Sequence, residues 1–177
     1  MSLTADQARF LLTTAIPALK SEHQTSQRVI EAIPRENSDY RPDPACKTAI
    51  ELAWHIVATE KRFFNAVAAG KFDFTPMPRP ESVRTGSDIA AWSDINFTEG
   101  MKALEALSTE QLLQIIDFRG MFQLPAVSYI QFVINHTIHH RGQLSTYLRP
   151  MGGKVPSIYG ESYDAAQARL ASEAKAS

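Results

Sequence analysis

Clusters of proline and glycine divide the sequence into four long segments with helical spacing of apolar residues. The breaks fall at residues 34–44, 70–86 and 150–153, and a fourth, less regular break lies near residues 108–124. Proline removes a backbone donor and glycine favours helix ends, so such clusters interrupt helices. Between the breaks, apolar residues recur every three or four positions and almost nowhere alternate as in a strand. We therefore predict an all-α fold, a four-helix bundle.

The expected helices can be bounded from their end signals. Thr4 with Gln7, and Ser108 with Gln111, have the spacing of capping boxes, and Gly70 suits a helix C-terminus. Pro125 suits the first turn of the last helix, and Pro17 is expected to kink or restart the first one. The four helices are expected over residues 4–33, 48–69, 87–107 and 125–148, with a short helical turn after residue 108 and irregular or briefly extended chain over 115–123.

The connection after the first expected helix is long for a bundle, at roughly a dozen residues, and favours a crossover. A chain of 177 residues with 44% apolar residues suits one well-filled core. We therefore expect a single helical domain over residues 1–177, with its core at about 4–150 and a C-terminal tail at 151–177.

Charge and cysteine content narrow the expected partners and location. Lysine and arginine (18) nearly balance aspartate and glutamate (19), so no nucleic-acid or membrane partner is expected. No apolar run approaches the length of a membrane helix, and the N-terminus lacks the pattern of a secretory signal. The single cysteine, Cys46, excludes a disulfide within one chain, so we expect a cytoplasmic protein in which Cys46 is an ordinary thiol.

Three of the five histidines lie close together in the last expected helix, at His136, His139 and His140. Residues four apart on a helix sit about 6 Å apart along the axis, so two such imidazoles can reach one metal ion. With an advance of about 100° per residue, His140 falls within the apolar arc next to His136. His139 falls at its polar edge. The inward pair is therefore His136 and His140.

A third ligand is expected from another helix, because two imidazoles seldom hold a catalytic metal alone. His55 is the candidate, since it lies in the middle of the second expected helix beside its apolar side. His23 has polar neighbours and is interpreted as a residue of a solvated face. A lone inward histidine is usually a hydrogen-bonded core residue, but two adjacent buried imidazoles disfavour each other when protonated, and a metal removes that conflict.

Three stretches of the sequence resemble the DinB/YfiT-like family, the DNA-damage-inducible bundle proteins unrelated to the polymerase of that name. They are Tyr40-Arg-Pro-Asp-Pro, then Glu51-Leu-Ala-Trp-His-Ile, then Asn135-His-x-x-His-His-Arg-Gly-Gln-Leu. The resemblance implies a bundle with a crossover, frequent homodimers, and a nickel, zinc or similar divalent ion. It also implies that His55, His136 and His140 are the metal ligands.

The chemistry implied by three neutral imidazoles is that of an open, cationic site, which can hold water or an anionic substrate. Position 137 is threonine, so the glutamate base of H-E-x-x-H metalloproteases is missing, and no Glu-x-x-His supports a di-iron centre. Relatives in the family include enzymes that use low-molecular-weight thiols. We therefore expect a metal-dependent hydrolase or thiol transferase acting on a small molecule, with unknown catalytic residues.

Two alternatives stay open at the level of sequence: a non-catalytic, stress-associated metal-binding dimer, and a metal-free bundle with satisfied core histidines. Gln143 is a candidate to support a ligand by a hydrogen bond, whereas Arg141 is interpreted as a surface or interface charge. For Tyr129 and Tyr147, core packing is favoured over a role at the site. Finally, Tyr159 and Glu161 belong to a tail that we expect to fold over the mouth of the site.

Overall fold

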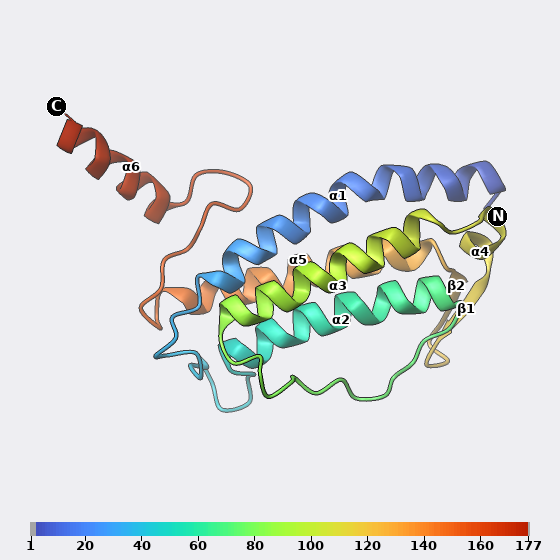
Figure 1. Ribbon diagram of the computed structural model, residues 1–177, viewed down its shortest axis with the longest axis horizontal. Helices are drawn as coiled ribbons and strands as arrows, with labels where there is room; N and C mark the ends of the chain where they lie inside the picture. Colours follow the sequence, from blue (N-terminus) through green and yellow to red (C-terminus); the bar gives the residue numbers. More distant parts are fainter. Residues whose placement is uncertain (1–2, 177) are drawn as a thin grey trace.

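The computed structural model describes residues 3–176 and is mostly helical (Figure 1). The elements in chain order are α1 (Ala5–Glu31), α2 (Ala49–Ala69), α3 (Gly86–Glu105), α4 (Thr109–Leu113), β1 (Ile115–Phe118), β2 (Phe122–Pro125), α5 (Ser128–Leu148) and α6 (Tyr163–Ala176). The long helices α1, α2, α3 and α5 form the bundle, which confirms the predicted fold class. No helix within the described residues has the length and apolar character needed to cross a membrane.

The helices pack in an order that differs from their order along the chain. α2 packs against α3 and α5, and α1 packs against the same two helices, so α1 and α2 lie diagonally. The colours in Figure 1 show α2 and α3 running in the same direction, with residues 70–85 returning along the outside. The connection between α1 and α2 therefore crosses one end of the bundle between diagonal helices, as its length suggested, whereas the connection that runs the length of the bundle is residues 70–85, between the parallel helices α2 and α3.

Polar caps and glycines set the ends of the helices. Capping boxes at Thr4, Thr48, Thr85 and Ser108 satisfy backbone donors at the starts of α1, α2, α3 and α4. Gly70 ends α2 with φ 69°, the left-handed conformation that glycine adopts most easily. Pro17 lies within α1, which nevertheless continues as one helix.

A small hairpin corrects the expected start of the last bundle helix. Pro125 ends strand β2, where it pairs with Ile115, and α5 begins only at Ser128. The turn between the strands contains Arg119 and Gly120, both with positive φ. A strand end tolerates proline because the ring's missing N–H is not needed there. The prediction of Pro125 in the first helical turn was therefore wrong. The C-terminal tail also holds a helix, α6, that the sequence analysis did not anticipate.

A belt of buried polar side chains crosses the bundle between two apolar clusters. One cluster includes Leu12, Phe63 and Val133, and the other includes Ile30, Ile56 and Leu144. On each long helix, the buried polar residues lie between the residues of the two clusters. They are His23, Thr25 and Ser26 on α1, Thr59 and Glu60 on α2, Ser93 on α3, and Thr137 and Arg141 on α5. The candidate site lies at this level.

Candidate metal centre

The three histidines selected from the sequence come together between α2 and α5. His55 projects from α2, while His136 and His140 lie one turn apart on α5, the antiparallel neighbour of α2. The ring of His55 lies 4.9 Å from that of His136 and 4.6 Å from that of His140, between ring centres. His139 is exposed and is not part of the group, as the helical period predicts.

The nitrogen atoms of this cluster are spaced as a metal ion requires. Nε2 of His55 lies 3.0 Å from Nε2 of His136 and 3.2 Å from Nε2 of His140. Two metal–nitrogen bonds of about 2.0–2.1 Å at a tetrahedral angle place their nitrogens roughly 3.3 Å apart. All the candidate ligand atoms lie within 4.8 Å of one another. Three imidazoles at this spacing can hold one divalent ion.

Burial keeps the three imidazoles neutral. It lowers the pKa of His55 to about 4, with the nearby charges of His140, Lys47 and Arg62 acting in the same direction. Burial lowers the pKa of His136 to about 3, and the neighbouring histidines add to the shift. The pKa of His140 is also lowered by burial, against the opposing effect of its hydrogen bond to Gln143. Neutral imidazoles are the form that binds metals.

Gln143 fixes the orientation of one candidate ligand. Its Oε1 lies 3.1 Å from Nδ1 of His140, and its Nε2 donates to the Tyr147 hydroxyl at 3.1 Å. An amide oxygen only accepts hydrogen bonds, so Nδ1 of His140 carries the proton and donates. The Nε2 lone pair of His140 is then left facing His55. Gln143 thus has the supporting position that the sequence analysis proposed for it.

His136 lacks a comparable partner within residues 3–176, since its Nδ1 is buried without a hydrogen bond. Its Nε2 is directed at His55. A neutral imidazole carries one proton on either nitrogen. A proton on the unpartnered Nδ1 would free Nε2 as a ligand atom, which matches the spacing of the cluster.

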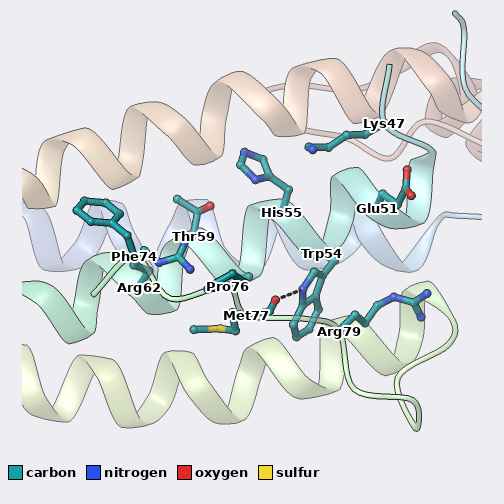
Figure 2. A pocket seen from close by; sticks show the side chains of 11 residues that line it. Lys47, Glu51, Trp54, His55, Thr59, Arg62, Phe74, Pro76, Met77 and Arg79 are labelled. Atoms are coloured by element: carbon teal, nitrogen blue, oxygen red, sulfur yellow. Dashed lines mark hydrogen bonds between the residues drawn. The ribbon is translucent and has the colours of Figure 1, made fainter. Parts of the chain in front are cut away.

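A cavity of about 670 Å³ opens beside His55 (Figure 2). Its floor is formed by α2, which contributes Thr59 and Arg62 at one and two turns beyond His55. Its outer wall is the segment 70–85, which is attached to α2 by side chains. Nε1 of Trp54 donates to the Met77 carbonyl at 2.9 Å, and Arg62 donates to the Asp73 and Thr75 carbonyls. A ligand atom of the cluster therefore adjoins a space large enough for a small molecule.

Some residues that line this cavity had not been singled out from the sequence. Lys47 precedes α2, and Thr59 and Arg62 lie four and seven residues after His55. That spacing puts Thr59 and Arg62 on the helical face of His55, so the same periodicity could have identified them. The outer wall could not be predicted from the sequence. Residues 71–80 form no helix or strand, so no regular period indicates which side chains face the cavity.

His23 is buried, contrary to its interpretation as part of a solvated face. The residue is 5% exposed and its ring stacks on Phe97 with 3.8 Å between ring centres. Nδ1 of His23 lies 3.3 Å from the buried carboxylate of Glu60, and Gln27 approaches the other ring nitrogen. Because α1 crosses the polar belt at this point, its polar residues face other helices. His23 is not part of the three-histidine group.

Arg141 also differs from its interpretation as a surface or interface charge. It is 1% exposed and forms an ion pair with Glu22 of α1 at 2.5 Å. It donates to the Tyr159 hydroxyl at 2.6 Å, so the tail is joined to α1 and α5. Glu161 pairs with Arg169. In the described part of the chain, the cavity beside His55 is lined by no tail residue, so the expected closure of the site by the tail is not found.

The two candidate tyrosines of α5 are core residues. The Tyr129 hydroxyl donates to the Ile116 carbonyl at 2.8 Å and so secures the hairpin. Tyr147 packs edge-on against Tyr40, and its hydroxyl accepts a hydrogen bond from Gln143. Tyr147 thus reaches the histidine cluster only through Gln143, and Cys46 is half-buried beside it.

Fold and site together define a crossover four-helix bundle with a three-histidine cluster between two antiparallel helices. The model of the DinB family matches residues 10–174, and the chain belongs to that family. Two Bacillus subtilis proteins, YjoA and YrdA, are each 27% identical to it, over 75% and 78% of this chain and 85% and 82% of their own lengths.

Solved structures agree on the fold. A DinB-like protein from Bacillus cereus superposes with a TM-score of 0.69 at 25% identity, covering 82% of this chain and 95% of its own. The crystal structure of YjoA gives a TM-score of 0.68 at 23% identity and covers 84% of this chain and 99% of its own. The family expected from the motifs is thereby confirmed.

Proposed function

We propose that this protein is a divalent-metal-dependent enzyme whose ligands are His55, His136 and His140, and which activates water or a low-molecular-weight thiol. The observation that carries the proposal is the convergence of three neutral imidazole nitrogens beside an accessible cavity. A divalent ion with an open position lowers the pKa of bound water towards about 7 or holds a thiolate. Nickel or zinc suits an all-imidazole ligand set.

In this proposal the three imidazoles, Gln143 and the segment 70–85 have separate roles. The three imidazoles supply neutral donors, so a bound ion keeps its full charge and favours anionic nucleophiles. Gln143 holds His140 in the tautomer that presents Nε2. The segment 70–85 shields one side of the cavity from solvent and leaves room for a small substrate beside His55. The reaction type is hydrolysis or transfer of a thiol.

The cavity also favours this proposal over a non-catalytic metal-binding dimer. A purely structural ion is normally enclosed by four protein ligands. Here the group within residues 3–176 offers three, and one of them lines a cavity. An open coordination position next to a substrate-sized space is the arrangement of catalytic sites.

Metal content of single variants tests the ligand assignment. We expect protein purified without chelators to retain a divalent metal, and His55→Ala, His136→Ala and His140→Ala each to lose most of it because three-imidazole binding needs all three donors. His139→Ala is the matched control, since it removes an adjacent imidazole outside the cluster, and it should retain the metal. Elemental analysis gives the readout, and circular dichroism checks that each variant is folded.

The assignment is overturned if His136→Ala keeps its metal or if His139→Ala loses it. The catalytic part of the proposal has a separate test, a screen of nickel- and zinc-loaded protein against cellular thiols with electrophiles and against hydrolysable esters. Turnover that disappears in His136→Ala supports an enzyme. Full metal occupancy with no turnover in this screen would favour the non-catalytic dimer.

A further inference from the structure

Positively charged side chains outnumber negatively charged ones around the cavity beside His55. Lys47, Arg62 and Arg79 line it, against the single carboxylate of Glu51. In Figure 2 the Lys47 side chain extends from the start of α2 towards the ring of His55. The Lys47 ammonium group and the ring of His55 therefore border the same cavity.

Most of these charges already have partners. Arg62 donates to the Asp73 and Thr75 carbonyls, and Arg79 donates to the Val83 carbonyl. Glu51 accepts from the backbone of Thr48 at 2.8 Å in the capping box of α2. Lys47, in contrast, has no hydrogen bond or ion pair among the described residues. It is the lining cation that remains available to a ligand.

The rest of the lining suits an organic molecule. Trp54 of α2 and Phe74, Pro76 and Met77 of the segment 70–85 contribute apolar surface to the lining of the cavity. The Thr59 hydroxyl lies one helical turn from His55 and has no hydrogen-bond partner in residues 3–176. Ligand sites combine such apolar walls with a few placed polar groups. One free ammonium group matches one anionic group on the ligand.

We propose that the cavity binds a small organic carboxylate, with the carboxylate on Lys47 and the reacting group beside His55. The apolar part of the molecule then lies against Trp54 and Met77, and the Thr59 hydroxyl is free to hydrogen-bond to it. This inference rests on the proposed function, because the reacting group is an end of the same substrate. That end either carries the thiol or is attacked by the activated water. The inference adds the charge and the orientation of that substrate.

A matched pair of thiols tests the inference. 3-Mercaptopropionate and 3-mercapto-1-propanol share the sulfur and the chain length and differ in the terminal carboxylate. We expect cobalt-loaded protein, titrated with each thiol and followed by visible absorption, to bind the carboxylate roughly tenfold more tightly, as a hydrogen bond to a charged group implies. In Lys47→Ala the preference should disappear, and in Lys47→Arg it should largely persist.

Lys102→Ala is the control for the change in net charge, because Lys102 is an exposed lysine on α3 that does not line the cavity. It should keep the full preference. Equal affinity of wild-type protein for the two thiols, or a preference that survives Lys47→Ala, overturns the inference while leaving the metal proposal intact. Failure of both thiols to change the spectrum of bound cobalt overturns the inference and the thiol-transfer form of the proposed function, and leaves hydrolysis to the ester screen.

If the protein retains none of cobalt, nickel and zinc, the proposed function fails and the carboxylate site is tested without metal. The same two thiols are then titrated into 15N-labelled protein, and the amide shifts of α2 residues are followed by NMR. Shifts that saturate at lower concentration for the carboxylate, and only when Lys47 is present, support the inference. The same response to both thiols contradicts it.

Discussion

Gln143 links the candidate metal ligands to the core of the bundle. Through the oxygen and the nitrogen of its side-chain amide it joins Nδ1 of His140 to the hydroxyl of Tyr147, which itself packs edge-on against Tyr40. A ligand imidazole whose second nitrogen is held in this way has its ring orientation and its tautomer fixed before metal binds. The side chain therefore contributes to affinity without contacting the ion.

Gln143→Leu should weaken metal binding by roughly 10–100-fold, because losing such a supporting hydrogen bond typically has an effect of that size. The measurement is a competition titration with a chromophoric zinc chelator. Gln131→Leu is the matched control, since Gln131 is exposed on the same helix and, among the described residues, its side chain bonds only to Asn135. Unchanged zinc affinity in Gln143→Leu would show that His140 is oriented by packing alone.

At the level of single residues, the sequence predicts the cluster but not the polar belt around it. His136 and His140 follow from the helical period, which needs only the spacing of residues on one helix. His23 and Arg141 are misread because polar neighbours normally indicate a solvated face, whereas here they face partners on other helices. Burial of a polar side chain depends on its partner, and sequence distance does not reveal partners such as Glu60 and Glu22.

Two glycines on the bundle helices have opposite structural roles. Gly100 on α3 is buried, and a Cβ built there overlaps the ring of Phe64 on α2. Gly142 on α5 is exposed, and a Cβ there meets nothing within 4 Å. Gly100 therefore allows the close approach of α2 and α3, whereas no contact on α5 requires a glycine at position 142.

We expect Gly100→Ala to lower the free energy of unfolding by about 1–3 kcal/mol, through overpacking against Phe64. Gly142→Ala should raise it by about 0.5–1 kcal/mol, since alanine favours an exposed helix position. Urea denaturation of the two variants and the wild type measures both changes, with an unchanged m-value as the check on comparability. A stabilising Gly100→Ala would mean that Phe64 has room to move.

The helices of the bundle are predictable from sequence, and the small elements are not. Capping boxes and glycine stops placed the ends of α1, α2 and α4 to within a few residues. The strands Ile115–Phe118 and Phe122–Pro125 are four residues each, too short to display an alternating pattern. The start of α5 was misplaced for this reason, since Val127 offers no side-chain cap that could mark it.

For the whole molecule, the crossover is the feature that brings His55 next to α5. Because the chain crosses the bundle after α1, α2 becomes the antiparallel neighbour of α5. The length of the connection predicts the crossover, but which helices become neighbours depends on packing across the whole bundle. Trp54, Val57 and Phe64, three large or branched apolar residues of α2, are all buried within the single chain. The homodimer implied by the resemblance stays a prediction.

The histidine cluster should make the metal-free protein sensitive to mild acid. His55 and His136 have pKa values of about 4 and about 3 in the folded protein, below the ordinary 6.5. Below pH 6.5 the histidines of the unfolded chain take up protons, whereas those of the folded protein do not. The free energy of unfolding therefore decreases as the pH is lowered and increases as the pH is raised. This loss should continue down to about pH 4, and carboxylates add to it at the acid end.

The expected result is a melting temperature of EDTA-treated protein that decreases steadily from pH 7 to pH 5, where few carboxylates titrate. His136→Phe should show a flatter profile over the same range, because one of the shifted groups is gone. Differential scanning fluorimetry in buffers of constant ionic strength provides the measurement. Identical profiles for the variant and the wild type would mean that the cluster does not resist protonation.

The most direct test of the central claim, a three-histidine site with an open position, is a crystal structure of zinc- or nickel-loaded protein with anomalous data at the metal edge. We predict one anomalous peak about 2.0–2.1 Å from Nε2 of His55, His136 and His140, with a solvent molecule completing the coordination on the cavity side. A peak elsewhere, a peak ligated by His139, or a fourth protein ligand that closes the site would contradict the claim.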